Sequence, residues 1–207
     1  MFQPLLVLGT ANRKKGEELA DLLLGVGVEM RTLADFADAL RVPEDGASFA
    51  ENAGRKAAAQ ARHLGHWVLA DDSGLEVDAL HGAPGVLSAR YAGPDATDVA
   101  NNRLLLERLG STPLEQRTAR FVCHMALADP AGRIRAQAEG SCRGRILFEP
   151  RGGQGFGYDP LFELVEYHRT LAELGVAVKG VLSHRARAAR MLIPTLTALI
   201  ASGEWSA

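Results

Sequence analysis

Apolar and polar residues alternate along the chain with two different periods, and the change of period predicts an α/β fold. In the first part, short apolar runs at residues 4–10 and 27–33 flank an amphipathic segment at 15–24. This order predicts two parallel strands joined by a helix in a right-handed crossover. Between residues 118 and 147, apolar side chains instead recur at every second position around the turn DPAG, which predicts an antiparallel ribbon.

The most regular helical pattern lies in the segment ASFAENAGRKAAAQARHLG. Ser48 and Glu51 have the spacing of a capping box, which predicts that the helix begins there. Gly65 predicts its end, since glycine adopts the left-handed conformation that closes many helices. One face of this helix carries Ala50, Ala53, Ala57, Ala61 and Leu64, and its small alanines predict close packing against a neighbouring element.

The remaining segments predict further helices and one long connection. A helix is expected over residues 98–109, after a connection at 82–97 that is rich in glycine and proline. A short helical piece is expected near 169–174. The C-terminal helix is expected to begin at Ser183 and to kink at Pro194.

Length and composition narrow the class of protein. The 207 residues, of which 47% are hydrophobic and 23% charged, are typical of a globular protein that buries about 70% of its unfolded surface. No linker or repeat divides the sequence, so we expect residues 1–207 to form a single domain. The net charge of −2 gives no global basic field, so nucleic acid is not expected as a partner.

The length of the first apolar run and the spacing of the cysteines exclude further classes of protein. The first apolar run is too short for a secretion signal or a membrane span, so we expect a cytoplasmic protein with no membrane partner. Cys123 and Cys142 have neither the spacing of a zinc site nor that of a disulfide framework.

Two adjacent acids follow the apolar run HWVLA, which predicts a buried strand entering a turn at residues 71–74. Asp71 and Asp72 would repel each other without a positive partner, and a hard cation such as magnesium takes carboxylate oxygens as ligands. Alternatively, both acids serve only to form the turn. Glu44, in the preceding loop, is a candidate third acid. Since successive strand side chains face opposite ways, only one aspartate is expected to reach a reacting centre.

A second polar group could hold a phosphate. The segment TANRKK brings Thr10, Asn12 and Lys15 to a strand end and a helix start, where hydroxyl, amide, ammonium and backbone N–H donors lie together. It is not a P-loop, because GxxxxGK[ST] is absent. The alternative is a capped helix start with solvated lysines. Lys56 is likewise either a phosphate contact or a solvated lysine.

Two later segments could recognise a flat ligand. RGGQGFGYDP at 151–160 sets glycines beside Phe156 and Tyr158, which favours a backbone close to the ligand and an aromatic ring free to stack on it. The alternative is a flexible glycine hairpin. His184 and Arg185 lie at a helix start, where the helix dipole opposes cations. A compensating acceptor is therefore expected, either a purine carbonyl or phosphate, or a neighbouring carboxylate.

Five motifs in this order resemble the inosine triphosphate pyrophosphatase family, whose members are also called dITP/XTP pyrophosphatases. They are TxNxxK, the acid before SFAEN, ADDSGLEVDAL, RGGQGFGYDPLF and KGVLSHR, and with PGVLSARYAG and ARFVCHMALA they extend over nearly the whole chain. The resemblance implies an elongated mixed β-sheet flanked by helices, with two lobes around a central nucleotide cleft. It also implies hydrolysis of ITP, dITP and XTP to the monophosphate and pyrophosphate, by a homodimer that uses Mg²⁺, with Mn²⁺ as a substitute.

The resemblance further implies a role for each matched residue. Asp72 is expected as the general base and, together with Glu44, as a metal ligand. The phosphates and sugar are expected to contact Thr10, Asn12, Lys15, Lys56 and Ser73. The base is expected to contact Phe156, Gly157, Tyr158, Asp159, Lys179, His184 and Arg185. Donors from His184 or Arg185 to the purine O6 would be left unpaired by adenine, which would favour 6-oxo purines.

Three other functions remain open at this point. A Maf-like pyrophosphatase would prefer UTP or TTP. A nucleotide sensor would bind ITP without turnover, and a phosphatase would release inorganic phosphate. The preferred nucleotide and the released product distinguish the four functions.

Overall fold

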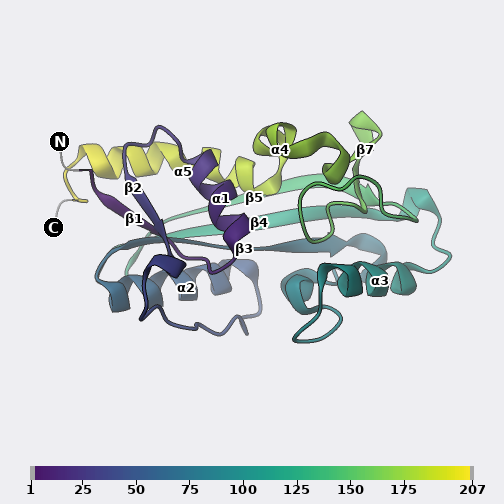
Figure 1. Cartoon of the computed structure of the whole chain (residues 1–207), viewed down its shortest axis with the longest axis horizontal. Helices are drawn as coiled ribbons and strands as arrows, with labels where there is room; N and C mark the ends of the chain where they lie inside the picture. The colour runs from purple at the N-terminus through teal and green to yellow at the C-terminus, as the bar shows by residue number, and fades with distance from the viewer. Residues whose placement is uncertain (1–2, 206–207) are drawn as a thin grey trace. The chain divides into compact units, whose positions relative to one another are not determined.

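The computed structural model describes residues 3–205. Its strands are β1 (Leu5–Leu8), β2 (Glu29–Thr32), β3 (Trp67–Val77), β4 (Thr118–Ala128), β5 (Ile134–Ile146), β6 (Phe162–Leu164) and β7 (Arg169–Thr170). Its α-helices are α1 (Arg13–Leu22), α2 (Phe49–Leu64), α3 (Asp98–Leu109), α4 (Leu171–Leu182) and α5 (His184–Ala201) (Figure 1). None of the described helices is long and apolar enough to cross a membrane.

The strands form one mixed sheet in the order β2-β1-β3-β4-β5-β6-β7. β1 is parallel to both β2 and β3, and Leu6 pairs with Met30 on one side and with Trp67 on the other. β6 is antiparallel to both β5 and β7. This mixed sheet with helices beside it confirms the predicted α/β class, including the β-α-β opening.

The chain divides into two compact units, each with its own core. The first unit contains the chain up to Asp72, Cys123–Gly140 and the chain from Arg185 onward. The second contains Ser73–Val122 and Ser141–His184. β3, β4 and β5 contribute residues to both units, so the unit boundary falls within strands.

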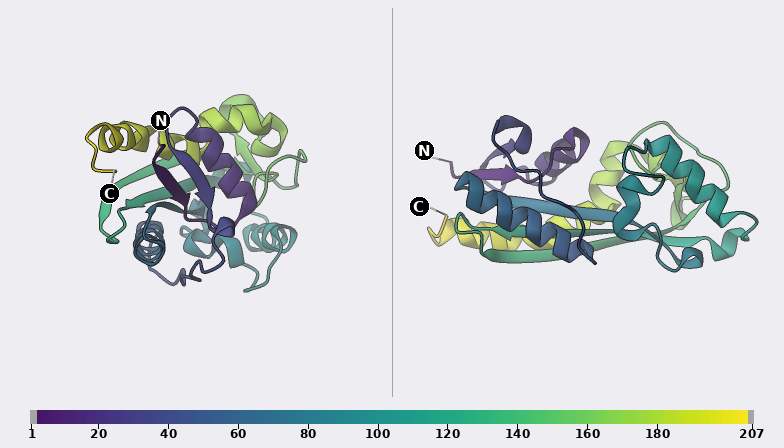
Figure 2. Two further views of the ribbon diagram at one scale, coloured as in Figure 1. Left: turned by 60° about the vertical axis from the view of Figure 1, so that its left-hand side comes forward. Right: turned by 90° about the horizontal axis from the view of Figure 1, so that it is seen from below.

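In the first unit, helices cover both faces of β3. Figures 1 and 2 show α1 and α5 on one face of this strand and α2 on the other. Leu69 belongs to the cluster beneath α1 and α5, whereas its neighbours Val68 and Ala70 belong to the cluster beneath α2. The predicted alanine stripe of α2 packs into this second cluster through the fully buried Ala53, Ala57 and Ala61.

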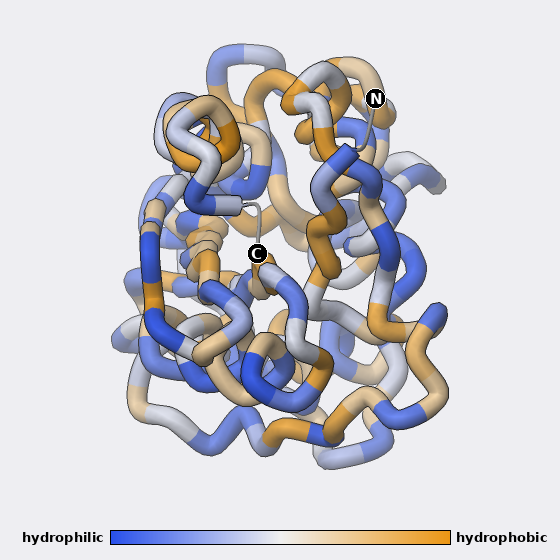
Figure 3. Tube along the Cα trace, turned by 90° about the vertical axis from the view of Figure 1, so that its left-hand side faces the viewer, coloured by the Kyte–Doolittle hydropathy of each residue, from blue (hydrophilic) through white to orange (hydrophobic). Residues whose placement is uncertain are grey.

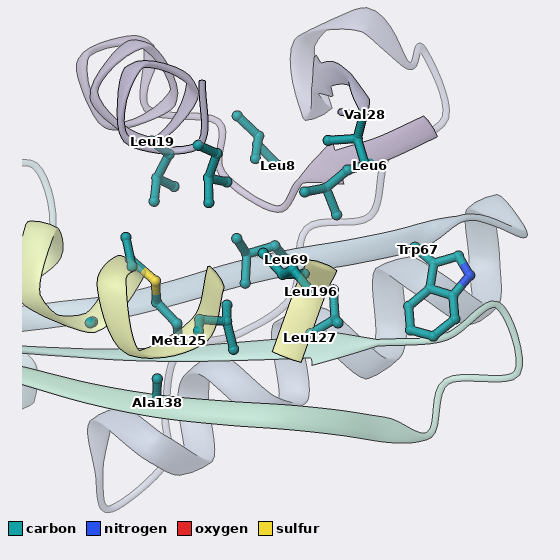
Figure 4. Packing of buried hydrophobic residues seen from close by; sticks show 14 of the residues in the cluster. Leu6, Leu8, Leu19, Val28, Trp67, Leu69, Met125, Leu127, Ala138 and Leu196 are labelled. Carbon is teal, nitrogen blue, oxygen red and sulfur yellow. The ribbon is translucent and has the colours of Figure 1, made fainter. Parts of the chain in front are cut away.

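Large side chains fill the cluster beneath α1 and α5. Leu8, Leu19 and Leu69 point toward one another there (Figure 4). Trp67 stacks on Trp205, with ring centroids 4.3 Å apart. Full burial of a large apolar side chain such as leucine contributes about 1.5–3 kcal/mol to the free energy of unfolding. Figure 3 shows apolar and polar stretches that alternate along the chain.

The second unit has a separate core that joins β4 to α3 and to the chain around β6. Phe121 of β4 lies 4.7 Å from Phe162 of β6, measured between ring centroids. Leu105 and Leu109 of α3 are buried in the same cluster. α3 spans the residues predicted for it, and Gly110 is its C-cap.

β3 is longer than the sequence predicted, and the turn expected at residues 71–74 is wrong. The strand continues to Val77 without interruption. Leu75 and Val77 extend its buried pattern, and sheet pairing outweighs the local turn preference of Asp-Asp-Ser-Gly. The two aspartates are therefore strand residues and not turn formers.

Two helix ends also differ from expectation. Ser48 Oγ accepts a hydrogen bond from the Glu51 N–H, as predicted, but the Glu51 carboxylate accepts from Ala47 N–H, so the capping box is only half formed. α4 extends beyond the predicted residues 169–174. A second helical stretch follows the first after a kink at Gly175, where φ is 79°.

Asp129 fixes the turn between β4 and β5. Its Oδ1 accepts from the backbone N–H groups of Ala131 and Arg133 at 3.0 Å each, and its Oδ2 accepts from Arg133 Nε at 2.9 Å. Burial raises the pKa of this carboxyl, but the bonds from Arg133 and Ala131 outweigh burial and lower the pKa. A carboxylate with a lowered pKa stabilises the fold above its unfolded pKa, and this contribution is lost as the pH falls through its native pKa.

We expect Asp129→Asn to reduce the free energy of unfolding by about 1–3 kcal/mol at neutral pH, because charged acceptor bonds are lost. Urea unfolding of wild type and variant measures this difference. The exposed loop variant Asp95→Asn is the control and should change stability by less than about 0.5 kcal/mol. The Asp129 difference should shrink in acid, and a difference that stays constant well below the native pKa would contradict this role.

Candidate active site

Successive side chains of β3 point to opposite faces of the strand. Its two adjacent aspartates therefore lie on different faces, and both are buried. Asp71 and Asp72 are 1% and 5% exposed. Asp71 meets side chains of α1 and α5, whereas Asp72 meets side chains of α2. This confirms the expectation that the two acids face opposite ways and have different surroundings.

Asp72 is held by two side chains of α2. Asn52 Nδ2 donates to Asp72 Oδ2 at 2.9 Å, and Lys56 Nζ lies 3.7 Å from Oδ1. The same ammonium donates to Glu44 Oε1 and to the Asp71 backbone carbonyl, each at 2.7 Å. The Lys56 side chain is only 12% exposed, so the alternative of a solvated lysine is wrong.

The surroundings shift the pKa values of this group. Burial raises the pKa of Asp72, and Lys56 and the Asn52 hydrogen bond offset only part of that shift. Burial lowers the pKa of Lys56, but Asp72 and Glu44 outweigh it, so its pKa is raised. A carboxylate with a raised pKa accepts a proton more readily than an ordinary aspartate, which suits a general base.

Asp71 lies in a separate buried ion-pair group. Arg185 donates to Glu18 Oε2 through Nη1 at 2.6 Å, and its Nε and Nη2 lie 3.3 Å from Asp71 Oδ2. Burial lowers the pKa of Arg185, but the two carboxylates outweigh it and keep the guanidinium charged. Burial also raises the pKa of the Cys123 thiol, which lies beside Asp71. A neighbouring carboxylate is therefore the compensating acceptor for Arg185.

The N-terminal segment forms the capped helix start that was its predicted alternative. Asn12 is the N-cap of α1, with its Oδ1 accepting from Lys15 N–H at 3.1 Å. Thr10 Oγ1 accepts from Asn12 N–H at the same distance. Lys15 is not solvated, because its Nζ lies 3.6 Å from Asp71 Oδ2 and its side chain is 19% exposed. The helix N-terminus and this ammonium together favour an anion.

Asp72 and Glu44 form a donor set of the kind that magnesium uses. Both carboxylates contact the Lys56 ammonium, so they are arranged around one positive charge. Within residues 3–205, no three His, Cys, Asp or Glu side chains gather into a metal site. Magnesium in phosphate-handling sites needs only one or two carboxylates, with waters and substrate phosphates as the other ligands. Two carboxylates therefore fit a magnesium ion that binds with a triphosphate.

In the second unit, Phe156, Asp159 and Lys179 form one contact group. Lys179 Nζ donates to Asp159 Oδ2 at 2.8 Å and lies 4.3 Å from the centroid of the Phe156 ring. Asp159 Oδ2 also accepts from the Phe156 N–H at 3.0 Å. His184 stacks on Phe121, with ring centroids 4.8 Å apart. The glycine-rich segment is thus tied to α4 by a buried ion pair, and it forms bends and turns and not a hairpin of two strands.

Tyr158 is not free to stack on a ligand, which corrects the expectation for its ring. The side chain is 4% exposed and packs in the core of the second unit. Its hydroxyl donates to the Ser88 carbonyl at 2.9 Å. Burial raises the pKa of Tyr158, and the residue anchors the loop to the core.

α3 contacts the backbone of the same loop. The N–H of Gly157 donates to Asp98 Oδ2 at 2.8 Å, and its carbonyl accepts from Asn102 Nδ2 at 2.9 Å. Both polar groups of this glycine are therefore bound by side chains of one helix.

The predicted site residues fall into two groups. The first unit contains Thr10, Asn12, Lys15, Glu44, Lys56, Asp72 and Arg185. The second contains Ser73, Phe156, Gly157, Tyr158, Asp159, Lys179 and His184.

Four residues that contact the predicted site residues were not predicted from the sequence. Asn52 could have been found, because it lies four residues before Lys56 and shares its face of α2. Glu18 lies one helical turn after Lys15 and could have been found by the same rule. Asp98 and Asn102 gave no sequence signal, since the loop residue that they bind is far away along the chain.

The pair Gly152→Ala and Gly153→Ala tests the packing of the glycine-rich loop against α4. A Cβ at Gly152 would lie 2.5 Å from the carbonyl carbon of Ala172, and φ there is +82°. A Cβ at Gly153 would meet no atom within 4 Å. We expect Gly152→Ala to lower the free energy of unfolding by about 2–4 kcal/mol, through overpacking and backbone strain. Gly153→Ala should change it by less than about 0.5 kcal/mol in urea unfolding, and equal small effects would contradict this packing.

Comparison with known proteins gives concordant matches. The model of the Ham1 family matches residues 6–195. A dITP/XTP pyrophosphatase from Rhodopirellula baltica is 52% identical over 202 residues, which cover 98% of this chain and 97% of that protein. A dITP/XTP pyrophosphatase from Desulforamulus reducens is 51% identical over 94% of this chain and 96% of that protein.

Solved structures agree with the sequence matches. A HAM1 protein from Coxiella burnetii is 38% identical and superposes with a TM-score of 0.86, over 95% of this chain and all of that chain. The Staphylococcus aureus Ham1 protein is 36% identical with a TM-score of 0.83, over 94% of this chain and 98% of that chain.

Proposed function

This chain belongs to the Ham1 family, and we propose that it hydrolyses ITP, dITP and XTP to the nucleoside monophosphate and pyrophosphate. Relatives that share 52% and 51% sequence identity with it are named dITP/XTP pyrophosphatase. The structural observation that carries the proposal is the group around Asp72. A buried carboxylate with a raised pKa that is contacted by an amide and an ammonium suits activation of a water molecule.

In this proposal, Asp72 accepts the proton of a water that attacks the α-phosphorus. The water oxygen forms a bond to the α-phosphorus, the bond from that phosphorus to the bridging oxygen breaks, and pyrophosphate leaves with the electron pair. Asn52 fixes the Asp72 carboxylate through its hydrogen bond. Lys15, Lys56 and the N-terminus of α1 offset the negative charge of the phosphates.

Glu44 and Asp72 would hold Mg²⁺, for which Mn²⁺ could substitute. When bound, the metal would help neutralise the charge on the departing pyrophosphate.

The base is proposed to bind the second unit. The Phe156 ring offers a stacking surface, and Lys179 and Asp159 place a donor and an acceptor beside it. His184 is proposed as a donor to the purine O6. An adenine base would leave such a donor unpaired, at a cost of about 1–3 kcal/mol.

Product analysis with a panel of nucleotides tests the reaction. Pyrophosphate and inorganic phosphate are assayed separately from ITP, dITP, XTP, ATP, GTP and UTP, with and without Mg²⁺. We expect metal-dependent release of pyrophosphate from the first three only. A preference for UTP would favour a Maf-like activity, release of phosphate would favour a phosphatase, and binding of ITP without any product would favour a sensor.

Asp72→Asn tests the base. The amide oxygen can still accept the hydrogen bond from Asn52, so the fold should be retained, whereas a carboxamide cannot take the proton of the attacking water. We expect kcat to fall by about 10²–10⁴-fold, with far-UV circular dichroism unchanged. Asp95→Asn, on an exposed loop, is the matched control and should keep full activity. Near-normal kcat in Asp72→Asn would remove this residue from the base role.

A further inference from the structure

α3 binds both backbone polar groups of Gly157, at the centre of the loop that carries Phe156 and Asp159. Asp98 and Asn102 are four residues apart, so they lie one turn apart on the same face of α3. Asp98 accepts from the Gly157 N–H, and Asn102 donates to its carbonyl. Two bonds of opposite polarity to one residue restrict both its position and its rotation.

The position of Gly157 determines that of the side chains beside it. Phe156 precedes it, and the Phe156 N–H donates to Asp159 Oδ2, so a hydrogen bond joins Phe156 to Asp159 across Gly157. Tyr158 is fixed separately in the core. Movement of Gly157 along α3 would therefore shift the Phe156 ring and the Asp159 carboxylate while the core contact persists.

Asn102 makes its contact at a cost to stability. Its Oδ1 is buried and has no hydrogen-bond partner among residues 3–205. A buried acceptor without a partner destabilises the folded state, whereas an apolar side chain of similar size at this position would not. The hydrogen bond that Asn102 Nδ2 donates to Gly157 therefore explains why a polar side chain lies here. This bond indicates that Asn102 serves a purpose other than stability of the fold.

We propose that Asp98 and Asn102 are positioning residues for base recognition. They hold Gly157 so that Phe156 and Asp159 meet the base in one fixed geometry. This inference rests on the proposed function, in which the second unit binds the base of a purine nucleoside triphosphate. Asp98 and Asn102 themselves act through the loop and need not touch the nucleotide.

Asn102→Leu separates positioning from stability. The substitution removes the donor to Gly157 together with the unpartnered oxygen, so the melting temperature should stay within a few degrees of wild type. We expect KM for XTP and ITP to rise by about 10–100-fold, as for a displaced binding group, and kcat to change by a smaller factor. The preference for XTP over ATP in kcat/KM should narrow by a similar factor. Arg103→Gln, at a neighbouring side chain that is 81% exposed, is the control and should match wild type.

Variants of Asp98 test the other bond. Asp98→Asn keeps an acceptor oxygen for the Gly157 N–H and should keep KM near wild type. Asp98→Ala removes the acceptor and should raise KM in the same way as Asn102→Leu. Unchanged KM and selectivity in both Asn102→Leu and Asp98→Ala would overturn the proposal. A fall in kcat with unchanged KM would also overturn it, because it would indicate a smaller folded fraction.

The wild-type protein distinguishes failure of this inference from failure of the proposed function. If wild type releases no pyrophosphate from any purine nucleotide, the hydrolytic proposal fails. Binding of ITP to wild type and Asn102→Leu, measured by calorimetry without divalent metal, then decides the inference. Weaker binding by the variant supports the positioning role, whereas equal binding, or no binding by wild type, overturns it.

Discussion

The burial of two adjacent carboxylates in one strand is the constraint on which the first unit depends. A buried carboxylate without a positive partner is too costly for a folded protein, so each face of β3 must supply cations. Arg185 and Lys15 approach Asp71 from α5 and α1, and Lys56 approaches Asp72 from α2. The helices that cover the two faces are therefore tied to β3 by charge as well as by their apolar clusters.

The same constraint separates the roles of the two acids. Arg185 is shared by Asp71 and Glu18 in a fully packed group, which suits a structural ion pair. The Asn52 amide donates to Asp72, the Lys56 ammonium lies farther from it, and the pKa of the Asp72 carboxyl is raised. Because their side chains lie on opposite faces of β3, one of the two aspartates suits a structural ion pair and the other suits proton transfer. In the second unit, the buried Asp159–Lys179 pair lies beside the Phe156 ring.

Sequence periodicity predicted most of the fold, because helix ends and strand faces are set by neighbouring residues. The bounds of α3 and the alanine face of α2 are examples. The turn predicted at residues 71–74 was wrong, because pairing within the sheet overrides local preference. The partners of the site residues could not be predicted for the same reason. Arg185 and Glu18 are 167 positions apart, and Asp98 and Gly157 are 59 positions apart, so only the folded chain joins them.

In the proposed reaction, water attacks the α-phosphorus of a purine nucleoside triphosphate and Asp72 accepts its proton. Hydrolysis of ITP in ¹⁸O-labelled water, followed by mass spectrometry of both products, tests this most directly because it identifies the phosphorus that water attacks. Attack at the α-phosphorus places one ¹⁸O atom in the inosine monophosphate and none in the pyrophosphate. Label in the pyrophosphate, with unlabelled monophosphate, would show attack at the β-phosphorus and would contradict the proposed reaction.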